Sequence, residues 1–239
     1  MRILLILPAY NEEQSILRTV RQIREASFPP SMKVDDIVIN DGSNDGTERV
    51  CRENGIPCIS LVQNLGIGGA VQTGYLYACL RDYDIAVQFD GDGQHDIRSL
   101  PALTEPIMRG ECDFTVGSRF VGEESGFRST ALRRIGIRYL SAVIRLAAGV
   151  RVADVTSGYR AASREAVRFL ARKYPVDYPE PESLVQLHRR GFRIREVPAN
   201  MFPRGGGKSS IGSFRSVYYM CKVTLAILCA AVQRTEKRP

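Results

Sequence analysis

The sequence predicts an α/β fold in which a mostly parallel sheet is flanked by helices. Three observations indicate this fold. Short apolar runs alternate with helical patterns as far as residue 117, polar segments follow several of the apolar runs, and 44% of the 239 residues are apolar. Strands that alternate with helices form parallel βαβ units, and a chain of this length can bury one sizeable core.

The expected elements follow one another in that alternation. Strands are expected at 3–7, 36–40, 56–62, 85–89 and 114–117, and helices at 12–26, 46–54, 70–81 and 97–108. Beyond residue 117 the sequence becomes rich in arginine. There we expect a helix over 131–148, a polar turn over 154–160, a helix that includes Glu180 and Glu182, and a strand over 194–198.

The segments 8–13, 41–46 and 90–96 are polar and stand where strands are expected to end. In open parallel sheets, ligands bind at the carboxyl ends of the strands. Asp90, Asp92 and Gln94 are two residues apart, so an extended backbone directs them to one side. Oxygen ligands favour Mg²⁺ or Mn²⁺. The alternative is a carboxylate-rich turn that caps the helix expected from residue 97.

The segments 8–13 (PAYNEE), 40–47 (NDGSNDGT) and 89–96 (FDGDGQHD) together resemble the inverting glycosyltransferases of family 2. Within that family the chain resembles the polyprenyl-phosphate sugar synthases, which include dolichyl-phosphate mannose synthase. The resemblance covers roughly residues 1–210. It implies a Rossmann-like GT-A domain, which we place at residues 1–212. The apolar stretch and charged residues that follow predict a C-terminal amphipathic helix with a charged tail over residues 213–239, where relatives commonly have transmembrane helices.

The resemblance also implies a role for each matching position. The nucleotide would contact Pro8, Ala9, Tyr10, Glu12, Asp41, Gly68 and Asp90. The divalent metal, Mg²⁺ or Mn²⁺, would be held by Asp90, Asp92 and Gln94. The acceptor phosphate would contact Arg119 and Arg133, and a basic loop over the diphosphate would contain Arg204, Lys208 and Ser209. The catalytic residues would be Asp92, Glu182 and Arg204.

The implied reaction moves a hexose from UDP-hexose or GDP-hexose to a polyprenyl phosphate, with inversion. The enzyme would be cytoplasmic and peripherally associated with the inner face of the membrane or with a small membrane protein. Two alternatives stay open. A saccharide hydroxyl acceptor, in surface polysaccharide synthesis, would need Glu182 or Glu180 as a base. The second alternative is a catalytically inactive nucleotide-binding scaffold. Val155, where relatives often have proline, and Ile137 and Ser141 depart from the pattern and weaken the acceptor assignment.

Charge and cysteine content narrow the function class. The net charge of +7 suits an anionic bilayer, a phosphorylated substrate or nucleic acid. No nucleic-acid reader motif is present, so we expect no nucleic-acid partner. The six cysteines form no C-x-x-C pair, which predicts reduced core cysteines in a cytosolic setting. The apolar stretch 217–232 would span only ~24 Å against a bilayer core of ~30 Å, which predicts an interfacial or docking helix.

Overall fold

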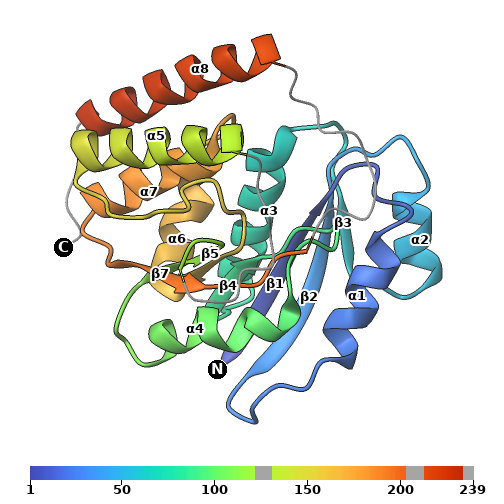
Figure 1. Cartoon of the computed structure of the whole chain (residues 1–239). Coiled ribbons are helices and arrows are strands. Elements are labelled where there is room, and N and C mark those ends of the chain that lie inside the picture. Colours follow the sequence, from blue (N-terminus) through green and yellow to red (C-terminus); the bar gives the residue numbers. More distant parts are fainter. Residues whose placement is uncertain (122–130, 203–212, 234–239) are drawn as a thin grey trace.

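A seven-stranded sheet lies at the centre of the computed structural model, in the order β3-β2-β1-β4-β6-β5-β7 (Figure 1). The strands are β1 (Arg2–Ala9), β2 (Lys33–Asn40), β3 (Cys58–Ser60), β4 (Ile85–Gln88), β5 (Phe114–Ser118), β6 (Arg160–Ser163) and β7 (Ile194–Pro198). Strand β6 is antiparallel to β4 and β5, whereas the other pairs are parallel. The structure describes residues 1–121, 131–202 and 213–233.

Helices cover both faces of the sheet (Figure 1). One face carries α1 (Ile16–Glu25), α2 (Thr47–Glu53) and α4 (Leu100–Met108), which follows the 3₁₀ turn η1 (Ile97–Ser99). The other face carries α3 (Gly66–Leu80), α5 (Ala131–Ala148), α6 (Arg164–Arg172), α7 (Pro179–Arg189) and α8 (Ser213–Val232). Successive side chains of a strand point to opposite faces. Leu4 and Ile6 of β1 therefore pack in the hydrophobic cluster under α3, whereas Leu5 packs in the cluster under α1 and α4 on the opposite face.

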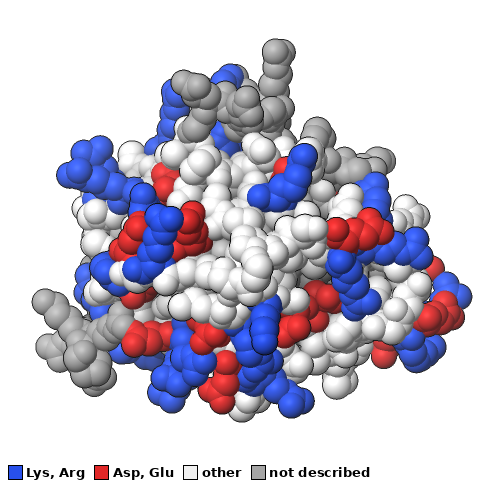
Figure 2. Space-filling model, turned by 90° about the horizontal axis from the view of Figure 1, so that it is seen from below, with Lys and Arg blue, Asp and Glu red and all other residues white. Residues whose placement is uncertain are grey.

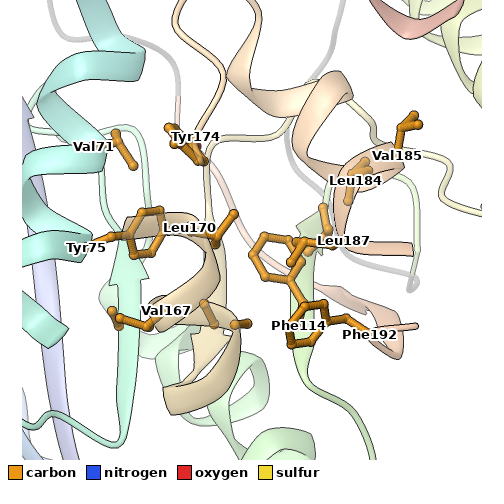
Figure 3. Packing of buried hydrophobic residues seen from close by; sticks show 14 of the residues in the cluster. Val71, Tyr75, Phe114, Val167, Leu170, Tyr174, Leu184, Val185, Leu187 and Phe192 are labelled. Carbon is orange, nitrogen blue, oxygen red and sulfur yellow. The ribbon is translucent and has the colours of Figure 1, made fainter. Parts of the chain in front are cut away.

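The core beneath α3, α6 and α7 also holds the segment that leads into α7. Tyr75 of α3 is fully buried and packs edge to face on Tyr174, with ring centroids 5.4 Å apart (Figure 3). Val71 and Leu170 belong to the same cluster (Figure 3). Burying a large apolar side chain contributes about 1.5–3 kcal/mol. This packing keeps the start of α7, which carries Glu180 and Glu182, close to the sheet.

The alternation of strands and helices is confirmed, with shifted ends. Helix α1 begins at Ile16 because residues before it form a turn, in which the Ser15 and Ile16 amides donate to the carbonyl of Glu12. Strand β6 and helix α6 were not expected. The sequence RAAS of β6 has no alternating pattern, and its strand conformation comes from pairing on both sides with β4 and β5.

Helix α8 packs against α5 and α7. Val223, Ile227 and Ala230 lie on its buried face, within the same cluster as α3. The division at residue 212 stays a prediction. Among the described residues, no helix is long and apolar enough to cross a membrane. All six cysteines are free thiols, but Cys221 and Cys229 are exposed on α8, so the expectation that every cysteine lies in the core was wrong.

Candidate active site

The loops that follow β1, β2 and β4 are joined by hydrogen bonds at the carboxyl ends of these strands. The amide of Asn11 donates to Ser43 Oγ at 2.9 Å, and the amide of Glu12 donates to Thr47 Oγ1 at 2.9 Å. The third loop is tied in by Thr19, whose Oγ1 donates to the carbonyl of Gly91 at 3.0 Å. Because β1 pairs in parallel with β2 and β4, three polar segments that are far apart in the sequence lie at the same edge of the sheet.

Asp41 connects the end of β2 to the start of α3. Its amide donates to the carbonyl of Ala9 at 2.8 Å, and its Oδ1 accepts from the amide of Leu65 at 2.7 Å. Gly42 follows Asp41 with a φ of +65°, and a Cβ at this position would stand 2.7 Å from the amide nitrogen of Asn64, in the loop before α3. A side chain at position 42 would therefore force the two loops apart.

The other residues expected at the nucleotide differ in their surroundings. Pro8 and Ala9 are buried at the end of β1, whereas Tyr10 is exposed and Glu12 is half-buried. Gly68 is buried in the first turn of α3, where a Cβ would stand 2.3 Å from the carbonyl oxygen of Pro175. This close approach gives Gly68 a packing reason to be glycine. Its contact with a nucleotide stays a prediction.

Asp90 and Asp92 lie in the loop after β4 beside the turn over residues 154–160. A Cβ on Gly158 would stand 3.0 Å from Asp90 Oδ2, so a side chain at position 158 would crowd the carboxylate. Asp92 is buried, and its Oδ1 accepts from the amide of Gln94 at 3.0 Å. The structure thus brings Asp90 together with the 154–160 segment.

His95, which was not among the expected site residues, supports the backbone of this loop. Its Nδ1 accepts a hydrogen bond from the amide of Asp90 at 3.0 Å, and its ring stacks on Tyr159 with centroids 4.6 Å apart. Burial lowers the pKa of His95, against the opposing effect of the Asp90 and Asp92 charges. A neutral imidazole is required here, because imidazolium has no acceptor nitrogen.

A buried polar network lies beneath Asp90. Gln88 Nε2 donates to Asp90 Oδ1 at 3.4 Å, and Gln88 Oε1 accepts from the hydroxyl of Tyr174 at 3.3 Å. Arg160 is fully buried and donates to the carbonyl of Glu180 at 2.6 Å. Burial raises the pKa of the Glu180 carboxyl, against the opposing charge of Arg160. Gln88 was not among the expected site residues, although it is the one amide side chain in the apolar run 85–89.

Arg119 and Asp154 form an ion pair in the interior. Arg119 Nε and Nη2 donate to the two carboxylate oxygens at 2.7 and 2.6 Å, and the side chains are only 5% and 0% exposed. Glu196 of β7 orients the segment by accepting the amides of Ala153 and Asp154 at 2.8 and 2.7 Å. Arg119 therefore has a structural partner, and its contact with an acceptor phosphate stays a prediction.

The remaining expected residues are placed only in part. Glu182 is half-buried in the first turn of α7, where burial raises its pKa and Gln186 Nε2 donates to its Oε1 at 3.1 Å. Arg133 lies in the first turn of α5, and its side chain is outside the described part of the structure. The whole expected diphosphate loop is also outside the described residues, with Arg204, Lys208 and Ser209.

The donors of the β4 loop suit a hard divalent cation. Asp90, Asp92 and Gln94 offer oxygen atoms, which Mg²⁺ and Mn²⁺ prefer. Within the described ranges, no three His, Cys, Asp or Glu side chains gather as a complete metal cage. Mg²⁺ in nucleotide sites does not need such a cage, since one or two carboxylates bind it together with substrate phosphates and water. The residues present therefore fit a metal shared with a diphosphate.

Comparisons with known proteins agree with this geometry. The family model described as Glycosyl transferase family 2 matches residues 4–170. A UDP-N-acetylglucosamine–dolichyl-phosphate N-acetylglucosaminyltransferase of Methanococcus voltae is 31% identical over 82% of this chain and 84% of its own length. An undecaprenyl-phosphate mannosyltransferase of Micrococcus luteus is 30% identical over 88% of both chains.

Solved structures show the same fold. The glucosyl-3-phosphoglycerate synthase of Mycobacterium tuberculosis, in complex with Mn²⁺, UDP and phosphoglyceric acid, matches 98% of this chain and 79% of its own with a TM-score of 0.73. At 23% identity this likeness concerns the fold alone. That protein has also been solved with Mg²⁺ and UDP. Since the family model covers most of the chain, the protein belongs to glycosyl transferase family 2 and is a nucleotide-sugar-dependent hexosyltransferase with a GT-A-like fold.

Proposed function

We propose that this glycosyltransferase moves a hexose from UDP-hexose or GDP-hexose to a polyprenyl phosphate, with inversion at the anomeric carbon. The single observation that carries the donor half is the placement of Asp90 and Asp92 at the carboxyl end of β4, in a loop that Thr19 of α1 holds by a hydrogen bond to Gly91. The acceptor half is supported by the names of relatives about 30% identical, which act on dolichyl or undecaprenyl phosphate.

The donor diphosphate would bind between the loop after β4 and the start of α3. Asp90, Asp92 and Gln94 would hold Mg²⁺ or Mn²⁺, which would supply positive charge to the departing diphosphate. Asp41, Pro8, Ala9, Tyr10 and Glu12 would bind the nucleoside, and Gly68 would lie beside the phosphates. The proposal also gives Arg204, Lys208 and Ser209 contacts with the diphosphate, because cations there favour the leaving group.

The acceptor side would be formed by the 154–160 segment and the start of α7. A polyprenyl phosphate is already an anion, so it can attack the anomeric carbon without a general base, and positioning supplies most of the rate. Glu182 would then orient sugar hydroxyls, while Arg119 and Arg133 would bind the acceptor phosphate. Such an acceptor resides in a bilayer, so the enzyme would work peripherally at the cytoplasmic membrane face.

The test is turnover with defined donors and acceptors. Purified enzyme should transfer sugar from a UDP-hexose or GDP-hexose to a short-chain isoprenyl phosphate in the presence of Mn²⁺ or Mg²⁺. Asp92→Asn should abolish this turnover without lowering the melting temperature, because it removes a metal charge and keeps the side-chain shape. Full turnover by Asp92→Asn would refute the metal assignment. Transfer to a saccharide hydroxyl, with none to isoprenyl phosphate, would refute the acceptor.

A further inference from the structure

Two helices form one outer surface on the α3 side of the molecule. Helices α5 and α8 run side by side in the same direction, and both pack against α7 (Figure 1). Gly136 of α5 lies against Met220, and Thr224 Oγ1 lies 3.3 Å from the hydroxyl of Tyr139. Because each helix uses one face for α7 and one flank for the other helix, their remaining faces turn to the same outer side.

The outer surface of α5 and α8 is apolar along both helices. Its exposed large apolar side chains are Ile135, Tyr139, Leu146, Tyr218, Leu225, Leu228 and Val232. Leu146 is 88% exposed and Leu225 is 62% exposed, in spite of their size. Exposed apolar residues are ordinary when scattered, but a stripe at helical spacing on two adjacent helices is typical of an interaction surface.

The charges on this surface have one sign. Neither α5 nor α8 contains an aspartate or a glutamate. Arg134, Arg138 and Arg145 are exposed on α5, and Lys222 is exposed on α8. By contrast, on the face shown in Figure 2, basic and acidic side chains are interspersed. Apolar stripes on helices whose own charged residues are all cationic are typical of helices that lie in the plane of an anionic bilayer.

Lys222 also locates this surface relative to the active site. Its ammonium lies 4.9 Å from the ring centroid of Tyr218. A hydrogen bond with Tyr218, together with the nearby Tyr178 and Asp177, raises the pKa of Lys222. Asp177 and Tyr178 directly precede α7, whose first turn carries Glu180 and Glu182. The N-terminal half of the surface therefore lies next to the proposed acceptor side.

We propose that the α5/α8 surface docks onto an anionic lipid bilayer, with the apolar side chains in the interface and the arginines at the headgroups. This inference rests on the proposed function only for its biological purpose, which is access to a lipid-borne acceptor. A second copy of the chain fits less well, because a two-fold contact through the same patch would bring the arginines of both copies together. Lipid headgroups carry the complementary charge.

The test is binding to vesicles without donor or acceptor. Wild-type protein should sediment with vesicles of phosphatidylcholine and phosphatidylglycerol in equal parts, and much less with phosphatidylcholine alone. In high salt this preference should weaken, since the Debye length falls from ~10 Å at 0.1 M to ~3 Å at 1 M. The double variant Leu225→Glu/Leu228→Glu should lower the partition coefficient at least about tenfold, because it places charges in the apolar stripe.

Matched controls separate docking from general surface effects. Leu76 and Leu80 on α3 are 48% and 73% exposed, so Leu76→Glu/Leu80→Glu makes the same double change elsewhere and should leave vesicle binding unchanged. Arg138→Gln/Arg145→Gln should remove the preference for phosphatidylglycerol. Equal vesicle binding by wild type and the Leu225→Glu/Leu228→Glu variant would overturn the proposal. It would also be overturned if wild type bound no vesicles and instead formed a dimer that this variant dissociates.

The two proposals fail in different ways. The Leu225→Glu/Leu228→Glu variant should keep wild-type turnover with a water-soluble isoprenyl phosphate and lose it with acceptor embedded in vesicles. Vesicle binding without any transfer to isoprenyl phosphates would refute the proposed acceptor and leave docking standing. Transfer to the soluble acceptor without vesicle binding would refute docking alone.

Discussion

Replacing Asp154 by alanine should be among the most destabilising single substitutions in the sheet region. Asp154 accepts the backbone amide, Nε and Nη2 of Arg119, and both side chains are almost completely buried. Removing one partner of a buried ion pair leaves the other charge without compensation, which costs about 3–5 kcal/mol. For a domain of this size each kcal/mol shifts the melting temperature by about 2–4 °C, so we expect a decrease of about 6–20 °C.

The assay is thermal and urea unfolding, followed by circular dichroism, beside a matched pair on the surface. Arg109 and Glu105 are 2.5 Å apart, but their side chains are 64% and 54% exposed. An exposed pair contributes only about 0.2–1 kcal/mol, so Glu105→Ala should change the melting temperature by a few degrees at most. The double variant Arg119→Met/Asp154→Leu should recover much of the loss, because it leaves no buried charge. Equal effects of Asp154→Ala and Glu105→Ala would refute this reasoning.

Two further predictions concern the acceptor side. Glu180→Gln should stabilise the protein at pH 8 and not at pH 4. Burial raises the folded-state pKa of Glu180. The stability that the protonated carboxyl contributes is therefore present below the unfolded-state pKa and is lost as the pH rises through the folded-state pKa. Urea unfolding at both pH values measures this, and a variant less stable than wild type at pH 8 would contradict it. Arg133→Ala should raise the acceptor KM more than the donor KM in steady-state kinetics, because a phosphate ligand is removed. A larger rise in the donor KM would exclude Arg133 from the acceptor site.

Much of the fold and part of the site were accessible from local patterns. The apolar runs and helical spacings correctly indicated β1, β4, α5 and β7, because the side-chain period of a strand or helix is a local property. The polar segments at strand ends correctly indicated which loops lie together, since parallel strands place their carboxyl ends at one edge of the sheet. Asp41, Asp90 and Asp92 lie in these loops, and their contacts with a ligand stay predictions.

Other features were settled only by tertiary structure. Strand β6 exists because β4 and β5 offer hydrogen-bonding partners on both sides of a short Ala-rich segment. Gln88 becomes part of the site because Tyr174, 86 residues away, reaches its amide. The partner of Arg119 is likewise 35 residues away, at Asp154. Burial makes such pairings strong, and burial is decided by packing between distant segments.

The α5/α8 surface shows most clearly which features follow from the sequence and which depend on tertiary packing. By itself, the sequence predicted a helix over residues 131–148 and an interfacial or docking helix over 217–232, where the structure has α5 (Ala131–Ala148) and α8 (Ser213–Val232). Only the tertiary structure decided which face of each helix is buried, and that Leu146 and Leu225 stay exposed. The reason is that α7 contacts both helices and so selects their inner faces, which leaves the apolar and cationic faces together on the outside.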